Sequence, residues 1–456
     1  MDIPPPPAHA PEPSRLDAPV WTTPAGEIRG WTDRGVARAT GIPYAKAGRH
    51  ERPRPVTTLR RPFEATRWSP SCPQVPIKQP SVILPPTLQP QPVSEHCQNL
   101  SITLPIDASP SDRLPLMVWI HGGSYTTGAG DISIFDPYPL VMEQRVVVVS
   151  VTYRLGMFGY LGAEAWRPAN LGLLDQVEAL AWVHRNIASF GDNPGNVTLF
   201  GQSAGGDSVA HLMIAEGTRG LFQRAVIASA PFGLTLERAA MSAAMAEEAS
   251  GIDEDSSADE IVAAQAHVEA AARPFGLRAA MPFGVQYGFD PLPAEGERDE
   301  AWSDVAHDVD VLVGWTAREV ALFTDEVPAL RRAGTVPGLG RGVREAAVRS
   351  LTEVVYGRGA RAFGRRHHRA GGHGYQYVLD WGPPRNPYRA AHTIDLPLLF
   401  GDEDAWRGSA ILAGSTWRDV DVAGRTVRGI WGDFARTGRL APRRRPGLIT
   451  VAALAA

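Results

Sequence analysis

NVTLFGQSAGGDSVAHLM, residues 196–213, joins an apolar run typical of a strand to a run typical of a helix through Gly-Gln-Ser-Ala-Gly-Gly. In the pattern Gly-x-Ser-x-Gly, the serine occupies a tight strand-to-helix turn with strained backbone dihedral angles. Side chains at Gly201 and Gly205 would collide with neighbouring backbone, so both positions must be small. The pattern therefore predicts that the hydroxyl of Ser203 projects above the carboxyl edge of a sheet, at the start of a helix that stabilises negative charge.

Strand-like and helix-like segments alternate along the chain. The segments 114–120 (LPLMVWI) and 146–153 (VVVVSVTY) are almost continuously apolar, which is typical of strands buried on both faces of a parallel sheet. Apolar residues recur at helical spacing between Leu174 and Ile187, and a loop at 190–196 leads into the strand VTLF. The remaining candidates are strands at 224–229, 309–314 and 375–379 and a helical insertion at 239–272. This alternation predicts an α/β fold with a mostly parallel central sheet flanked by helices.

Composition narrows the class of protein and of partner. The 456 residues are 44% hydrophobic and 21% charged, with a formal net charge of −4, which is ordinary for a soluble globular protein and gives no electrostatic reason to expect nucleic acid. The sequence contains no run of about 18 apolar residues, so no membrane span is expected. Residues 1–20 are rich in proline and predicted to be disordered. They lack the features of a secretory signal, which favours a cytoplasmic location, with secretion left open if a leader has been removed.

A serine hydroxyl is a poor nucleophile near neutral pH. It needs a base, a carboxylate that orients the base, and N–H donors for the oxyanion that develops on an attacked carbonyl. The sequence His121-Gly122-Gly123-Ser124 directly follows the apolar strand at 114–120. A histidine and two glycines in this position are typical of an oxyanion loop, because backbone without side chains can approach a substrate closely. The alternative is that this segment is a glycine turn without a catalytic role. Because the chain also contains the serine motif, the oxyanion loop is favoured.

Further motifs are spread along most of the chain: GIPYA (41–45), MVWIHGGSYTTGAG (117–130), VSVTYRLGMFGYLG (149–162), the segment 170–206, VDVLVGWTAREVALF (309–323), AAHTIDLPLLFG (390–401) and WGDFARTG (431–438). As a set they resemble the type-B carboxylesterases, the branch of the α/β-hydrolase fold that includes carboxylesterases, cholinesterases and the non-catalytic neuroligins. The resemblance runs from about residue 24 to residue 438 and is weak between 235 and 300. It implies one α/β-hydrolase domain over 21–456, with helical insertions over the active site.

The resemblance also implies roles for individual residues. Ser203 matches the nucleophile, Glu319 the acid and His392 the general base, in the chain order of α/β-hydrolases. The amides of Gly123, Ser124 and Ala204 match the oxyanion donors. Asp395 and Asp380 remain alternative partners for the imidazole, and other histidines lie nearby at 367, 368 and 373.

The function implied is that of a serine carboxylic-ester hydrolase acting through an acyl-enzyme on a small-molecule ester. One alternative is an acyltransferase or lactone-forming enzyme that uses the same triad. A second alternative is a non-catalytic binding module like the neuroligins, but the complete triad disfavours it. The sequence shows no metal-ligand spacing and no phosphate-binding motif, so no cofactor or metal is expected. It carries no signal for an oligomeric state.

Two departures from cholinesterases bear on the substrate. The residue before the nucleophile, glutamate in cholinesterases, is Gln202, and the loop from Cys72 to Cys97 contains no aromatic residue and no acid before Glu95. A choline ester is therefore not expected, because its ammonium group needs an aromatic face or a carboxylate. The motif SEHC resembles the family's SEDC, which implies a disulfide between Cys72 and Cys97, while reduction in the cytosol favours free thiols.

Overall fold

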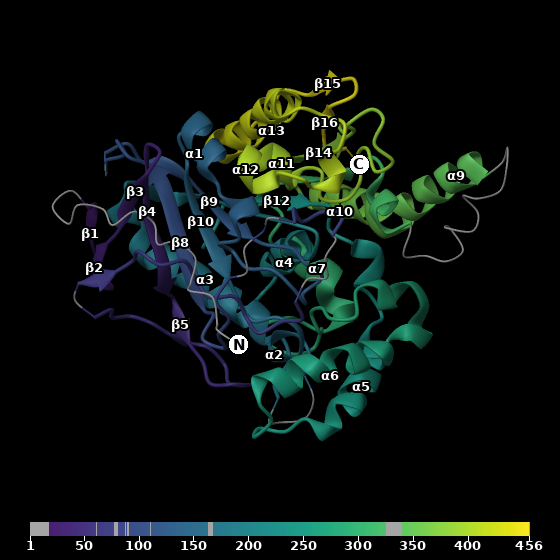
Figure 1. The fold of residues 1–456 in the computed structure, drawn as a ribbon, viewed down its shortest axis with the longest axis horizontal. Helices are drawn as coiled ribbons and strands as arrows, with labels where there is room; N and C mark the ends of the chain where they lie inside the picture. Colours follow the sequence, from purple (N-terminus) through teal and green to yellow (C-terminus); the bar gives the residue numbers. More distant parts are fainter. Residues whose placement is uncertain are drawn as a thin grey trace.

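The fold is built on one large mixed sheet. In the computed structural model, which describes residues 18–60, 62–76, 81–86, 88, 91–109, 111–162, 167–324 and 340–455, eleven strands pair in the order β15-β16-β14-β13-β12-β11-β9-β10-β8-β4-β3 (Figure 1). Their bounds are β3 Trp31–Asp33, β4 Val36–Pro43, β8 Asn99–Pro105, β9 Leu114–Ile120, β10 Val147–Thr152, β11 Asp192–Gln202, β12 Arg224–Ala228, β13 Asp310–Thr316, β14 Gly374–Leu379, β15 Arg443–Arg445 and β16 Ile449–Ala453.

The middle of this sheet is parallel. Strands β10, β9, β11, β12, β13 and β14 run in the same direction, and the strands beyond β10 and β14 pair antiparallel. This confirms the predicted mostly parallel sheet. The carboxyl ends of the parallel strands therefore meet at one edge, which is where open α/β sheets place their binding sites.

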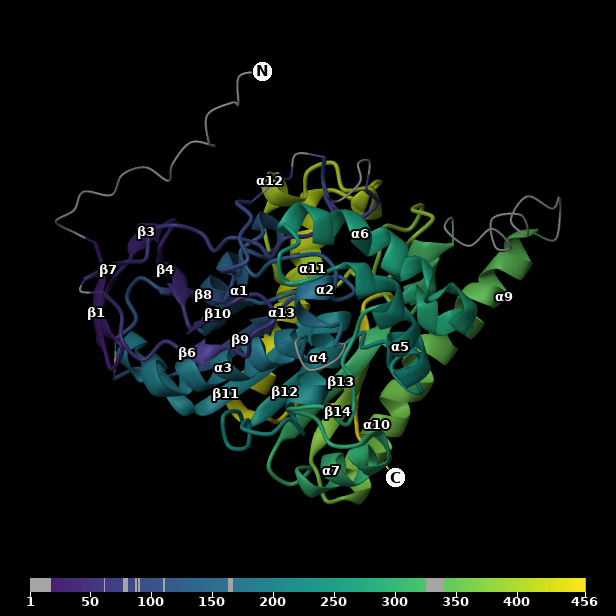
Figure 2. The same ribbon diagram turned by 90° about the horizontal axis from the view of Figure 1, so that it is seen from below.

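The central strands are buried on both faces, as their apolar sequences predicted. Along β9, Leu116 and Val118 face one hydrophobic core, while Met117 and Trp119 face the other. Helices α3 (Leu171–Asn186), α4 (Ala204–Leu212) and α10 (Arg358–Arg369) contribute to the first core, and α1 (Tyr138–Gln144), α11 (Leu396–Leu399) and α13 (Trp417–Thr437) to the second. Figure 1 shows α1 and α13 above the sheet, and Figure 2 shows the opposite face with α3, α4 and α10.

Three local expectations are changed by the structure. The predicted loop at 190–196 is wrong in part, because β11 already begins at Asp192, which pairs with Leu114 before the register shifts at Val197. The predicted helical insertion at 239–272 is two helices, α5 (Ala239–Glu248) and α6 (Ala258–Ala270), which pack on each other (Figure 1). Most of the Pro-rich segment 1–20 lies outside the described residues, but Val20 already belongs to strand β1 (Val20–Thr23).

The two cysteines are free thiols in the structure, so the disulfide implied by the resemblance is not formed. Both side chains are fully buried, and the sulfur of Cys72 accepts the backbone N–H of Leu155 at 3.3 Å. Burial raises the pKa of the Cys97 thiol well above its ordinary value, which keeps it protonated and unreactive.

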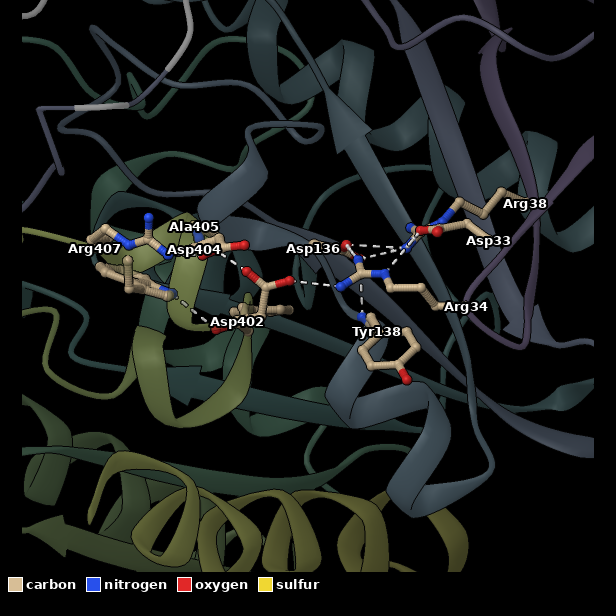
Figure 3. Close-up of polar contacts among 11 residues, drawn as sticks. Asp33, Arg34, Arg38, Asp136, Tyr138, Asp402, Asp404, Ala405 and Arg407 are labelled. Atoms are coloured by element: carbon tan, nitrogen blue, oxygen red, sulfur yellow. Dashed lines mark hydrogen bonds and ion pairs between the residues drawn. The ribbon is translucent and has the colours of Figure 1, made fainter. Parts of the chain in front are cut away.

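A buried arginine joins the antiparallel end of the sheet to the rest of the molecule (Figure 3). Arg38 on β4 is fully buried, and its Nη2 lies 3.0 Å from Asp136 and 3.2 Å from Asp33. Its guanidinium carbon also lies 5.6 and 5.5 Å from the ring centroids of Trp31 and Trp68, within the range of cation–π attraction.

The neighbouring Arg34 extends this network at the surface. Its Nη2 lies 2.9 Å from Asp136 and its Nη1 lies 2.6 Å from Asp402, whose other carboxylate oxygen caps α12 (Glu403–Trp406) (Figure 3). Asp136 and Asp402 are therefore held to the β3–β4 hairpin by adjacent arginines. Because Asp402 closely follows α11, the network also fixes the end of the segment that carries His392.

Replacing Arg38 by Met is expected to lower the free energy of unfolding by about 1.5–3 kcal/mol, because Asp33 and Asp136 lose their charge-assisted contacts with a buried guanidinium and keep only the partly exposed Arg34 as a partner. The matched control is Arg34→Met, which is expected to cost less than about 1 kcal/mol because its side chain is 43% exposed. Urea unfolding of both variants measures the difference. An equal decrease in the free energy of unfolding in the two variants would show that the burial of Arg38 does not increase its contribution to stability.

Candidate active site

Ser203 lies at the turn between β11 and α4 in a strained backbone conformation. Its φ is 61° and its ψ is −127°, outside the regions that residues with side chains normally adopt. A Cβ on Gly201 would lie 2.3 Å from the carbonyl oxygen of Gly205, and a Cβ on Gly205 would lie 2.1 Å from that of Ile120. The two glycines of the motif are therefore required by close backbone contacts, as the sequence predicted.

His392 connects Ser203 to Glu319. Its Nε2 lies 2.8 Å from Oγ of Ser203, and its Nδ1 lies 2.5 Å from Oε2 of Glu319. The serine is half-buried, while the histidine and the glutamate are buried. Residues 203, 319 and 392 thus form one hydrogen-bonded chain that fits a Ser-His-Glu triad, with its outer end accessible to a small molecule.

Glu319 is positioned by backbone as well as by the imidazole. It follows β13 and is fully buried, its Oε1 accepts the N–H of Thr316 at 2.7 Å, and its carbonyl accepts the N–H of His392 at 3.1 Å. The rings of Tyr356 and Phe323 lie 5.3 and 5.7 Å from the imidazole ring. These contacts exclude water from the glutamate side of the imidazole and strengthen the hydrogen bond between them.

Asp395, the nearest alternative carboxylate, does not contact the imidazole nitrogen that Glu319 occupies. It is fully buried, and burial together with the negative charge of Glu319 raises its pKa from 3.8 to about 7. Below about pH 7, Asp395 is therefore mostly in its neutral, protonated form. Asp380 is exposed, at the end of β14.

The competing histidines lie elsewhere. His367 and His368 are on α10, where the ring of His367 stacks on Phe363 and burial lowers its pKa to about 4. His373 precedes β14, at the amino end of that strand, and its Nδ1 lies 3.3 Å from Asp310. The structure brings none of them to Ser203, whose imidazole partner is His392.

The predicted oxyanion loop packs directly on the serine turn. A Cβ on Gly122 would lie 2.5 Å from the carbonyl oxygen of Gln202, and a Cβ on Gly123 would lie 2.0 Å from that of Thr127. Among the described residues, no acceptor takes the amide N–H of Gly123 or of Ser124. The N–H of Ala204 is the first of α4 and so has no acceptor within the helix. All three amides are thus available to a ligand.

The sequence analysis missed a buried network that holds this loop in place. Tyr125, which has a φ of 61°, donates its hydroxyl to Asp207 of α4 at 2.6 Å, and Ser208 donates to the same hydroxyl oxygen at 3.2 Å. The loop is thereby tied to the helix that begins at Ser203. An aspartate within a buried helix is the sequence signal that could have revealed this contact, since buried carboxylates require partners.

Other kinds of site are not found in the described part of the chain. Its residues include no group of three or more His, Cys, Asp or Glu side chains arranged to hold a metal ion. Its helices include none that is both long and apolar enough to cross a bilayer.

The chain is similar in sequence to known proteins. The model of the carboxylesterase family matches residues 17–334, about two thirds of the chain. The chain belongs to the carboxylesterase family. It is 37% identical over 435 residues to a Rhodococcus erythropolis protein named as a probable N-octanoylanthranilate hydrolase, covering 93% of this chain and 95% of that protein.

Two further matches agree with the family. A para-nitrobenzyl esterase of Bacillus subtilis is 34% identical, with 91% of this chain and 89% of that protein covered. A solved thermophilic PNB esterase superposes with a TM-score of 0.78 at 30% identity, over 95% of this chain and 97% of that one. The α/β-hydrolase fold is therefore confirmed, and the protein is an ester-hydrolysing enzyme.

Glu319 is hydrogen-bonded to His392 and Asp395 is not, so substitutions of these two acids are expected to have different effects on activity. Glu319→Gln is expected to lower kcat by about 10³–10⁴-fold, because an amide cannot stabilise the imidazolium that forms during catalysis. Asp395→Asn is expected to change kcat by less than about tenfold, because asparagine resembles the protonated acid. Steady-state hydrolysis of a p-nitrophenyl ester measures both. Loss of activity in Asp395→Asn with retention in Glu319→Gln would reverse the assignment.

Asp395→Asn also has a pH-dependent control. Because the folded-state pKa of about 7 lies above the ordinary 3.8, the folded protein retains a proton that the unfolded chain releases. This group's contribution to stability is therefore expected to fall as pH rises from about 4 to about 7. The variant should lack that decline, so its urea midpoint relative to the wild type should be higher at pH 8 than at pH 5.

Proposed function

We propose that the protein is a serine carboxylic-ester hydrolase in which Ser203 is the nucleophile, His392 the general base and acid, and Glu319 the carboxylate that orients it. The observation that carries this proposal is the chain of short contacts from Oγ of Ser203 through the two imidazole nitrogens to Oε2 of Glu319. The complete triad argues against a non-catalytic, neuroligin-like role.

In the first step, Oγ of Ser203 attacks the ester carbonyl carbon while Nε2 of His392 takes the hydroxyl proton. The imidazolium is stabilised through Nδ1 by the buried carboxylate of Glu319. The tetrahedral intermediate then collapses, the bond between the carbonyl carbon and the alcohol oxygen breaks, and the departing oxygen receives the proton from Nε2.

In the second step, water replaces the alcohol. Nε2 of His392 takes a proton from the attacking water, and the proton returns to Oγ when the carboxylic acid leaves. In both steps, the negative oxygen of the intermediate is stabilised by the amides of Gly123, Ser124 and Ala204 and by the amino end of α4. Ser124 can serve because only its backbone N–H is needed.

The surroundings of the triad favour small to medium neutral esters. Gln202 is a buried, neutral amide beside the nucleophile, where it supplies no charge for a cationic substrate. Glu95, the acid of the 72–97 loop, is held by Arg49, whose Nε lies 2.7 Å from Oε2 of the carboxylate. This ion pair neutralises the charge that could otherwise attract an ammonium group.

Aromatic residues from the weakly matching region 235–300 do not alter this expectation. The hydroxyl of Tyr287 lies 2.7 Å from Nε2 of His211, and its ring lines a cavity whose lining includes none of the triad residues. The rings beside His392 belong instead to Tyr356 and Phe323.

Two alternatives use the same acyl-enzyme. The match to the Rhodococcus erythropolis protein makes N-octanoylanthranilate a candidate substrate. This compound is an amide, so its nitrogen would leave in place of the alcohol oxygen and would take the proton from Nε2 of His392, and its turnover is to be compared with that of the ester p-nitrophenyl octanoate. Acyl transfer is tested by adding alcohols during turnover, because an acceptor other than water partitions the acyl-enzyme between a new ester and the free acid.

Ser203→Ala is expected to lower kcat by about 10⁴–10⁶-fold and to leave the fold intact, because the change removes one half-buried hydroxyl. Labelling with a fluorophosphonate should modify the wild type at one residue and fail in the variant. Turnover by purified Ser203→Ala protein at more than about 1% of the wild-type rate would exclude Ser203 as the nucleophile.

The neutral-substrate proposal predicts a preference between two esters of matched shape. The uncharged 3,3-dimethylbutyl butyrate is expected to have a kcat/KM at least about tenfold higher than butyrylcholine, because the ammonium group would lose hydration without gaining a partner. Assays at low and moderate salt check this. A preference for butyrylcholine that weakens as salt rises would overturn it.

A further inference from the structure

A large cavity lies on the α5 side of the molecule, separate from the triad. Its volume is about 1070 Å³, and it is bounded by one face of α5, by the segment 167–169 and by the segment 285–290. Its lining, taken from the described residues, includes none of Ser203, Glu319 and His392. This volume is at the upper end of the range of small-molecule binding sites.

The walls of the cavity are largely apolar. Ala239, Ala243 and Ala246 line it from successive turns of α5, where their small side chains leave the space open. Val285 and Phe289 contribute from the facing segment, and the side chain of Phe289 is 57% exposed. Together these side chains provide an apolar surface against which the apolar part of a ligand can pack.

The cavity lining includes two buried arginines, Arg167 and Arg238, which make one part of its wall cationic. Arg238, which precedes α5, is only 5% exposed and donates to the carbonyl oxygens of Leu234 at 3.0 Å and Pro282 at 2.6 Å. It forms no ion pair with a carboxylate of the described residues, and burial lowers its pKa to about 10, although Asp207 favours its charge from farther away. A buried cation whose acceptors are neutral carbonyls gains most from an anionic partner.

Among the described residues, the acids that line the cavity do not pair with Arg238. Asp290 pairs with Arg52 at 2.8 Å, and its side chain is 63% exposed. Glu295 accepts the backbone N–H of Glu237 at 2.7 Å, and Glu247 is exposed on α5. The acids that line the cavity therefore lie toward solvent or bind backbone, while Arg238 is buried.

We propose that this cavity is a second binding site, for a carboxylate that carries an apolar chain. The carboxylate binds the buried guanidinium of Arg238 by a charge-assisted hydrogen bond. The chain lies against the alanine face of α5 and against Phe289. The residues that line the site do not include Ser203, Glu319 or His392.

In the test, Ser203 of the full-length protein is first blocked with diisopropyl fluorophosphate, so that the catalytic site does not contribute. Decanoate is then titrated into this protein in a calorimeter. One equivalent of decanoate is expected to bind. Decyltrimethylammonium, which has the same chain and the opposite charge, is expected to bind at least about tenfold more weakly, as the loss of a charge-assisted hydrogen bond predicts. Equal affinity for the two amphiphiles would overturn the proposal.

Variants locate the site. Arg238→Gln is expected to weaken decanoate binding at least about tenfold, while Arg52→Gln, at an exposed cation of the same cavity, should leave it within about twofold. Because Arg238 also ties two backbone segments together, Ala243→Trp is the second variant. It fills the cavity from an exposed helix position, and it should abolish binding while ester hydrolysis continues.

The outcomes separate this site from the catalytic one. Unchanged decanoate affinity in Ala243→Trp, or in folded Arg238→Gln, would overturn the proposal. Failure of diisopropyl fluorophosphate to modify Ser203 would instead count against the proposed function, and the same variants would then be compared in unlabelled protein.

Discussion

Close packing of the start of α4 against the ends of β9 and β12 is the constraint on which the site depends. A Cβ on Gly205 would lie 2.1 Å from the carbonyl oxygen of Ile120, and one on Gly206 would lie 2.5 Å from that of Ala228. The same carbonyl of Ala228 accepts the N–H of Ser203 at 2.9 Å. These contacts hold a serine with a φ of 61° that would otherwise relax, and they fix the hydroxyl relative to the helix amides.

Burial decides the charges around this turn. Glu319 is fully buried yet has a donor on each carboxylate oxygen, from Thr316 and from His392, so its negative charge is compensated. Asp395 is equally buried and close enough to Glu319 for its pKa to be raised to about 7. Below about pH 7, Asp395 is therefore mostly protonated, while Glu319 accepts the contact from Nδ1 of His392.

Much of the fold could be predicted from the sequence, because the central strands are apolar on both faces and long enough to be distinguished from loops. The errors occurred where local pattern is weak. The segment 190–196 contains Asp, Asn, Pro and Gly, typical of a loop, yet β11 begins at Asp192 because β9 offers it a partner. The helical composition of 239–272 did not separate α5 from α6, although the capping box formed by Ser257 and Glu260 marks where α6 begins. The disulfide that the resemblance implied is absent, and the structure has two buried free thiols in its place.

The sequence alone determined the serine turn and the glycine loop, because each depends on local steric requirements within a few residues, and the resemblance to the carboxylesterases implied the chain order of the candidate triad. Only the tertiary structure decided which carboxylate meets His392. Asp395 is three residues from the histidine and Glu319 is 73 residues away, yet the ends of β13 and β14 bring the distant one into contact. The Tyr125–Asp207 bond and the cavity at Arg238 were likewise decided by packing. Both features are formed by segments that lie far apart in the sequence, and no local sequence pattern shows that these segments are close in space.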